Sequence, residues 1–407
     1  SASRDRNRTR SALVVVQVAL ALVLVVSSAL MIRTFEALHD VDPGFADPAT
    51  IQTVRVWNPL FYVDAARNIR AEREMLDKLS SLPGVTSAGF TSTLPMEGQT
   101  SFAPIVFDGQ TVPAGQMPAS RRHKHVSPGY FEAMGTRIIA GRDVTWDDIE
   151  TGGRVALISE DFARELAPDP AGAVGKRIKT FLETDAWREV IGVVQNVREN
   201  GLNEDAPSMV YWPAVVESMF GSPLIATPSP AFVLRTERAD TATFLAEVRQ
   251  AIRSVDASLP ISNERTMRDL YSGSLARTSF VLALLAIAGG MALVLGVIGI
   301  YGVIAYVVSQ RRREIGIRAA LGAEPGQLKR TFLLHGLALT VVGAAVGLVA
   351  AVALGGLMSS VLFGVSPLDP IAYVVAVGVT VAAAALASYV PARRAAMIDP
   401  IETLRAD

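Results

Sequence analysis

Two histidines form the one pair of side chains whose spacing suggests a metal site. "HKH" places His123 and His125 two residues apart, which puts both imidazoles on one face of a strand. The chain contains no cysteine, and no third ligand stands at a suitable spacing. Alternating exposed residues on a strand explain the pair equally well, so we expect no metal site.

A second stretch, "GAVGKRI" (residues 172–178), is superficially similar to a phosphate-binding loop. Pro170 stands where that motif requires its first glycine, and Arg177 stands where Ser or Thr should follow the lysine. No nucleophile elbow, zinc-protease motif or carboxylate pair stands out either, and we expect Asp and Glu on solvent-facing surfaces. The chain is therefore predicted to be no enzyme and to bind no cofactor.

The composition predicts the general class of protein to which this chain belongs. Hydrophobic residues make up 50% of the 407 positions and charged residues 19%, with a mean hydropathy of +0.34. Such a mixture indicates membrane spans joined to a sizeable water-soluble part. A net charge of −1 gives no reason to expect nucleic acid. The first residue is Ser rather than Met, which suggests a processed, trimmed or excised segment.

Uncharged runs predict four membrane-spanning helices. Each run can cross about 30 Å of hydrocarbon at about 1.5 Å per residue. The first has a longer apolar core than a cleavable signal peptide, so we interpret it as an anchor. The predicted spans are residues 11–33, 276–310, 325–362 and 371–392.

Basic residues predict the orientation of these spans. Arginines are frequent in residues 1–10, 311–324 and 393–407, whereas the connection 363–370 holds only Asp369 as a charged residue. Four spans place all three basic segments in the cytoplasm, as the positive-inside rule prefers, whereas a fifth would place the last one outside. Both termini are then cytoplasmic, and residues 34–275 form one domain in the periplasm of a two-membrane envelope.

The outer domain is predicted to be α+β. Strand–helix–strand patterns at both of its edges suggest a split, ferredoxin-like sandwich. The segment between them, about 97–225, has the pattern of a β-rich subdomain, including residues 154–166 and 189–197. Residues 117–125 ("MPASRRHKH") are expected to form a loop. The edge patterns are at 50–57, 63–85 and 86–93, and again at 231–237, 241–256 and 260–267.

The arginine-rich stretch "RRREIGIRAALGA" (311–323) predicts a short cytoplasmic helix between two spans. Glu314 and Arg318 form a favourable i,i+4 pair, Gly322 can end the helix, and Pro325 can begin the next one. A bare topological anchor would need only the arginines. The added apolar helix therefore favours a surface on which another protein docks.

Small residues within the spans are expected to support helix packing. Gly296, Gly299, Gly343 and Gly347 would let helix backbones approach closely. The alternative is that glycine is simply common in membrane helices. His335 is the only ionisable group within the third run and is expected at the interface, not in a proton relay.

The same stretches resemble a known family. "RRREIGIRAALGA" closely resembles the cytoplasmic coupling element of MacB/FtsX-like ABC-transporter permeases, and "PARRAAMIDPIETLRAD" (391–407) resembles their carboxyl-terminal signature. Residues 126–145, 154–178 and 189–213 resemble the MacB-type periplasmic core domain. The resemblance covers nearly the whole chain.

This resemblance implies a permease subunit of the bacterial inner membrane. A separate or fused ABC ATPase would bind ATP, and its closure would pass through the short helix and the long helices to move the periplasmic domain for export. A second permease half or homodimer mate would complete the membrane part, with membrane lipid around it. A periplasmic adaptor and outer-membrane duct are further implied partners. An FtsX-type regulator of a cell-wall hydrolase and a lipoprotein-releasing permease remain alternatives, as does one half of a duplicated permease.

The resemblance also assigns two groups of residues. The ATPase-coupling interface would comprise Arg313, Glu314, Ile315, Gly316, Ile317, Arg318, Leu321, Gly322 and Ala323. The cytoplasmic tail signature would comprise Pro391, Arg393, Arg394 and Pro400.

Overall fold

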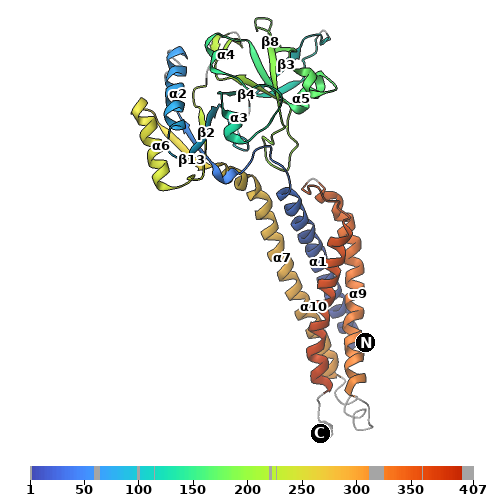
Figure 1. Cartoon of the computed structure of the whole chain (residues 1–407). Coiled ribbons are helices and arrows are strands. Elements are labelled where there is room, and N and C mark those ends of the chain that lie inside the picture. Colours follow the sequence, from blue (N-terminus) through green and yellow to red (C-terminus); the bar gives the residue numbers. More distant parts are fainter. Residues whose placement is uncertain are drawn as a thin grey trace, which may run out of the picture. The chain divides into compact units, whose positions relative to one another are not determined.

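The chain forms two compact units, shown in Figure 1. One is a helical unit (Ser1–Asp40 with Arg277–Asp407) and the other an α/β domain (Val41–Ala276). The computed structural model describes residues 2–58, 65–98, 101–113, 115–219, 222–225, 227–310, 325–359 and 361–396.

Four apolar helices occupy the described part of the helical unit. Each contains a segment long and apolar enough to cross a membrane, of 31, 33, 23 and 22 residues in chain order. The predicted four-span fold is thereby confirmed, although α1 and α7 extend well beyond the uncharged runs because polar residues also form helix outside hydrocarbon. The helices are α1 (Ala2–His39), α7 (Met267–Gln310), α9 (Pro325–Met358) and α10 (Pro370–Ala396).

Glycine contacts define the direction of each helix. α7 runs antiparallel to α1, α9 runs parallel to α1, and α10 runs antiparallel to α9. The start of α1, the end of α7, the start of α9 and the end of α10 therefore lie at one end of this unit. These contacts are Gly289–Leu24, Gly299–Gln17, Gly343–Val18, Gly347–Leu22, Gly336–Ser388 and Gly355–Tyr373.

The two edges of the α/β domain combine into one ferredoxin-like lobe. Its four strands are all antiparallel in the order β13-β1-β12-β2. Two amphipathic helices, α2 and α6, lie side by side against this sheet (Figure 1). The split βαβ prediction is therefore confirmed. The elements are β1 (Ile51–Val56), α2 (Ala65–Ser80), β2 (Val85–Thr91), β12 (Ala231–Thr236), α6 (Ala242–Val255) and β13 (Ile261–Thr266).

Strand alternation gives this sheet two different faces. On β12, Phe232 and Leu234 join the apolar core beneath the helices, whereas Ala231 and Val233 join a second core on the opposite face. The same period of two directs Val54 of β1 toward the helices. The next residue, Arg55, therefore points away from them, toward the inserted segment.

The inserted segment closes into a barrel lobe. Pairing runs β4-β3-β7-β8-β6-β9 and returns from β9 to β4 through a parallel ladder. Apolar side chains including Ile105, Ile158 and Trp212 fill one core of this lobe. The strands are β3 (Ser101–Phe107), β4 (Ser120–Val126), β5 (Ile138–Gly141), β6 (Val155–Ser159), β7 (Arg177–Thr180), β8 (Arg188–Val194) and β9 (Met209–Pro213), and a separate hairpin pairs β10 (Val216–Met219) with β11 (Ser222–Ile225).

Short helices lie in the connections between the strands of the α/β domain. α3 (Tyr130–Met134), α4 (Trp146–Glu150) and α5 (Glu160–Leu166) are α-helical, and η1 (Pro48–Thr50) and η3 (Pro170–Ala173) are 3-10 turns. The expectation that residues 154–166 belong to the β pattern is wrong for their second half. There the Ser159 side chain accepts a hydrogen bond from the Phe162 amide at 3.5 Å and caps α5.

The predicted loop at residues 117–125 is also wrong. Ser120–Val126 forms β4, which pairs with β3 on one side and β9 on the other. His123 and His125, expected as exposed, are only 8% and 9% exposed. Basic side chains here have partners inside the domain, which is why a polar stretch can occupy a buried strand.

The two lobes meet along a narrow seam between β2 and β4. The ladder contains Thr91 opposite Val126, and the Phe90 amide donates a 2.7 Å hydrogen bond to the Ser127 hydroxyl. Gly89 permits this approach, because a Cβ there would lie 2.5 Å from the Tyr130 backbone. The lobes therefore contact each other through backbone as well as side chains.

Candidate functional site

Two sites emerge from the fold, and the first is the packing of the helical unit around α1. A methyl group added to Gly343 would lie 2.7 Å from the Val18 side chain, and one at Gly347 would lie 2.9 Å from the Ala19 carbonyl oxygen. Such distances are shorter than carbon atoms tolerate. α9 therefore approaches α1 as closely as it does because these positions lack a side chain.

The other two glycines differ from each other. Gly299 of α7 lies against Gln17 and Val14 of α1, so a side chain there would collide. Gly296, one helical turn earlier, faces open space, and a Cβ would meet no atom within 4 Å in the described structure. The structure thus places three of the four predicted glycines at helix contacts and Gly296 outside them.

Charged side chains of this unit occur at both ends of its helices. Arg33, near the end of α1, forms a 3.4 Å ion pair with Asp369, which precedes α10. At the opposite end the guanidinium of Arg10 lies 4.3 Å from the centre of the Tyr306 ring. One contact joins α1 to the residue before α10 and the other joins it to α7, both outside the central apolar stretch.

Most of the predicted coupling and tail residues lie outside the described residues. Pro391 is buried within α10, and Arg393 is exposed on the same helix. Arg394 belongs to α10, and its side chain is not among those that the structure describes. The residues wholly outside it are Arg313, Glu314, Ile315, Gly316, Ile317, Arg318, Leu321, Gly322, Ala323 and Pro400.

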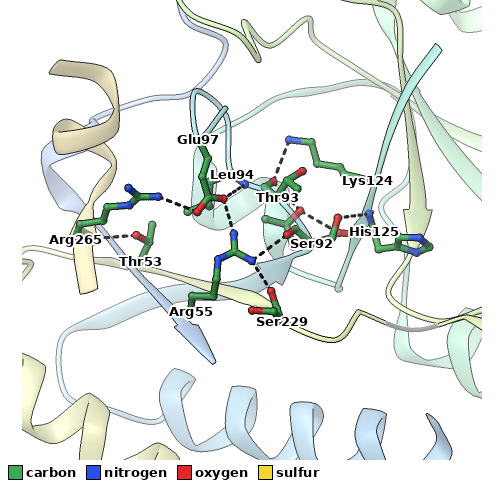
Figure 2. A network of polar contacts seen from close by, with 11 residues as sticks. Thr53, Arg55, Ser92, Thr93, Leu94, Glu97, Lys124, His125, Ser229 and Arg265 are labelled. Carbon is green, nitrogen blue, oxygen red and sulfur yellow. Dashed lines mark hydrogen bonds and ion pairs between the residues drawn. The ribbon is translucent and has the colours of Figure 1, made fainter. Parts of the chain in front are cut away.

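The second site is a buried polar network at the seam of the α/β domain, shown in Figure 2. Strand alternation turns Arg55 toward this seam, where its side chain is 10% exposed. Its guanidinium donates to the carbonyl of Ser92 at 3.1 Å and to that of Ser229. It also forms an ion pair with Glu97. One side chain thus joins β1, the segment after β2 and the segment before β12.

Glu97 is the acceptor at the centre of the network. Besides Arg55, it pairs with Arg265 of β13 at 2.8 Å and accepts the Leu94 amide at 3.1 Å. The preceding residue, Met96, has a left-handed backbone with φ 63°, unusual for a side chain of this size. This turn directs the Glu97 carboxylate, only 6% exposed, between two arginines.

A second buried ion pair lies in the barrel lobe. Lys124 of β4 and Glu199 are 2.6 Å apart, with side chains 1% and 7% exposed. The Glu199 carbonyl accepts the Met96 amide at 2.8 Å, which connects this pair to the Glu97 turn. The network therefore extends from the ferredoxin-like lobe into the barrel lobe.

The network favours a fixed arrangement of the two lobes, because separating one of its charged side chains from its partner would leave a buried ion unpaired. An ion left buried without its partner costs several kcal/mol, so both lobes favour the paired arrangement. The sequence prediction placed Asp and Glu on solvent-facing surfaces and so missed Glu97 and Glu199. The available signal was Arg55 within the apolar run "TVRVW", since a charge inside a strand pattern needs a buried partner.

The comparisons with known proteins bear on both units. The model of the MacB-like periplasmic core domain matches residues 11–252, more than half of the chain. The model of the FtsX-like permease C-terminal region matches residues 286–400. The chain belongs to the MacB-like periplasmic core domain family. With four apolar helices among its described residues, this MacB-like chain is a multi-pass membrane protein of the ABC permease class.

Individual relatives cover the MacB-like chain to different extents. The uncharacterized ABC transporter permease YknZ of Bacillus subtilis is 28% identical over 302 residues, covering 69% of this chain and 68% of its own. The macrolide export ATP-binding/permease protein MacB of Photorhabdus laumondii is 25% identical over 307 residues, covering 71% and 44%. The aligned part thus spans less than half of that MacB relative.

Two solved structures also match. The periplasmic region of MacB from Actinobacillus actinomycetemcomitans has a TM-score of 0.33 at 15% identity, covering 56% of this chain and 94% of its own. The extracellular domain of YknZ from Gram-positive bacteria has a TM-score of 0.31 at 16% identity, covering 52% and 100%.

The histidine pair of the MacB-like chain lies beside the network. The rings of His123 and His125 are perpendicular, with centres 6.3 Å apart. Burial lowers the pKa of each to about 4, and the neighbouring His125 contributes to the shift at His123. Both rings are therefore neutral near pH 7. Within the described ranges no group of three or more His, Asp or Glu could hold a metal ion.

A buried acid lies on the inner face of α2 in the ferredoxin-like lobe. Glu72 is fully buried, and one of its oxygens accepts a 2.9 Å hydrogen bond from the Asn68 amide group. Burial raises the pKa of Glu72 to about 8, although this hydrogen bond opposes the shift. The carboxyl group is therefore protonated at neutral pH, in contrast to the ionised pairs of the network.

Proposed function

We propose that the chain is the permease subunit of a MacB-like mechanotransmitting ABC transporter in a bacterial inner membrane. A partner ATPase binds ATP at the cytoplasmic face, and its closure moves the periplasmic α/β domain for export. The names of the macrolide export relatives support this direction of transport. A second permease half or homodimer mate, and an adaptor and outer-membrane duct, are the further partners.

One observation carries this proposal. α7 is a continuous helix of 44 residues, about 66 Å long at ~1.5 Å per residue. Its first turns contribute Met267 and Leu270 to a core of the α/β domain, and its last residue directly precedes the arginine-rich stretch. A continuous helix transmits displacement along its axis, so a push at the predicted coupling helix would reach that core.

Co-purification from native membranes tests the coupling. An ABC-type ATPase is expected to co-purify with the intact chain and to be lost from a Leu321→Glu variant. Leu182→Glu is the matched control, because Leu182 is 46% exposed in the α/β domain. Retention of the ATPase by Leu321→Glu, or its absence from the intact chain, would contradict the proposal.

Site-directed labelling tests the orientation. The chain has no cysteine, so single variants can be labelled without background. A membrane-impermeant maleimide added to spheroplasts should label Asp147→Cys, which lies in the α/β domain, and should label Arg393→Cys only after lysis. Labelling of both sites before lysis would show that they share a compartment.

A further inference from the structure

A cavity of about 460 Å³ lies beside the polar network, between the ferredoxin-like lobe and the barrel lobe. Its size is within the roughly 300–1,000 Å³ range of small-molecule sites. Trp57 and Thr227 line it from the ferredoxin-like side, and His123 and His125 line it from β4. The cavity therefore collects side chains from both lobes.

The charges around this cavity disfavour a cation. Arg55 lines it, and Arg188 lies close enough to lower the pKa of His125 further. A metal ion would add positive charge among these groups, with only two imidazoles as ligands. An anion is no better served, because both terminal nitrogens of Arg55 are already occupied by Glu97 and two carbonyls. A neutral ligand fits these charges.

The hydrogen-bonding groups indicate what the ligand must offer. His125 Nδ1 lies 3.0 Å from the Pro213 carbonyl, which can only accept, so Nδ1 carries the proton of the neutral ring. Its Nε2 is then an acceptor. Thr227 is 3% exposed, and its hydroxyl has no hydrogen-bond partner in the part of the chain that the structure describes. A ligand hydroxyl can donate a hydrogen bond to His125 Nε2 and accept one from the Thr227 hydroxyl, so hydroxyl groups on the ligand would satisfy both side chains.

The rim of the cavity supplies an apolar surface. Trp57 is 41% exposed overall and lines this cavity together with Pro228. An indole exposed beside hydroxyl-bearing residues suits a ring with an apolar C–H face and a polar edge. Ser92 and Ser229, from the segments after β2 and before β12, add further polar lining.

We propose that this cavity binds a saccharide unit, with its C–H face on Trp57 and its hydroxyls directed to His125 and Thr227. The inference does not depend on the ATPase coupling proposed above. The ligand could be a free sugar or the end of a longer glycan, which share this chemistry. Weak binding is expected, with a dissociation constant on the order of 1 mM, because a single sugar unit has few atoms and a solvated edge.

Saturation-transfer difference NMR on the full chain in lipid nanodiscs tests this, since sugar-based detergents would compete. The probes are glucose, N-acetylglucosamine and their methyl glycosides. At least one is expected to receive saturation from the intact protein, and Trp57→Ala is expected to weaken its binding by about tenfold. Equal binding of the methyl glycoside assigns the site to a glycan end, whereas a requirement for the free sugar assigns it to a small solute.

Matched variants keep the outcome interpretable. Phe102→Ala removes an aromatic side chain that is 70% exposed and does not line the cavity, and it should bind as the intact chain does. Thr227→Val keeps the buried shape and should weaken binding several-fold. Thermal unfolding verifies that each variant is folded. No saturation of any sugar, equal binding by Trp57→Ala, or protection against unfolding by inorganic phosphate alone would overturn the proposal.

Discussion

The helical unit and the α/β domain place their paired charged residues differently. In the helical unit, missing side chains at Gly343 and Gly347 allow close backbone contact, and the ion pair of Arg33 lies near a helix end. In the α/β domain, Lys124 and Glu199 are paired deep inside. Lipid offers no water to drive apolar association, so close packing must do so there, whereas a water-soluble core can fix its geometry with paired charges.

The largest expected loss of stability comes from breaking the buried pair of Lys124 and Glu199. Lys124→Met leaves Glu199 buried without a partner and should lower the free energy of unfolding by about 3–5 kcal/mol. All four tryptophans are in the α/β domain, so tryptophan fluorescence during denaturation reports that domain selectively.

The control for this variant is an exposed ion pair. Arg177 and Asp108 are paired with side chains 55% and 53% exposed, and Arg177→Ala should cost at most about 1 kcal/mol. A double variant, Lys124→Met with Glu199→Met, should recover much of the loss because no charge remains buried. Equal losses in the free energy of unfolding from Lys124→Met and Arg177→Ala would show that the buried pair stabilises the domain no more than the exposed pair does.

The next test overpacks the helical unit. Gly343→Ala places a methyl group against Val18 and should destabilise this unit by about 1–3 kcal/mol. Gly296→Ala, which meets open space, should leave it unchanged or stabilise it by up to about 1 kcal/mol, because alanine favours helix over glycine. Helical circular dichroism during thermal unfolding in nanodiscs measures both. The contrast fails if the two variants unfold alike.

Glu72 tests whether a lone buried acid behaves differently from a paired one. Because its pKa is raised to about 8, the folded domain holds a proton that the unfolded chain releases above its ordinary pKa near ~4.3. Stability should therefore decrease as pH rises from about 5 to 8, with a slope of up to about 1.4 kcal/mol per pH unit from this group.

Glu72→Gln should remove that contribution to the slope. Denaturation midpoints of the α/β domain at several pH values, for the intact chain and the variant, measure the difference. Parallel pH profiles for the two proteins would show that Glu72 is ionised in the folded domain.

The smallest effect is expected at a helix end. Arg33 is 36% exposed and its partner Asp369 14%, so Arg33→Ala should cost only about 0.2–1 kcal/mol. The charge reversal Arg33→Asp with Asp369→Arg should restore the value of the intact chain, as measured by thermal unfolding. A loss as large as that from Gly343→Ala would place this pair among the principal contacts.

Local patterns were sufficient to predict much of the fold. Uncharged runs predicted the four spans, and alternation and helical periodicity located the ferredoxin-like strands and helices. Closure of the barrel was not predictable in this way, because β4 and β9 pair across 87 residues of sequence and local periodicity contains no long-range register.

The site was harder to predict than the fold. Residues 117–125 read as a loop because Arg122, His123 and Lys124 suggest exposure, yet the partners of Arg122 and Lys124 come from distant segments. Glu199 looked solvent-facing for the same reason. The glycines at 343 and 347 were identifiable by spacing alone, whereas nothing in the local pattern distinguished Gly296 from Gly299. The coupling stretch at 311–323 remains a prediction.

The pairing of β1 with β13 has a consequence for how the α/β domain responds to load. The chain enters β1 at Ile51 and leaves β13 at Thr266, and the register places Gln52 opposite Thr266. Both attachments therefore lie at one end of the same antiparallel ladder. Tension that draws them apart would peel the ladder one hydrogen bond at a time, whereas equal tension on both is shared by the whole sheet. The domain therefore resists a force that moves both attachments together far better than a force that separates them.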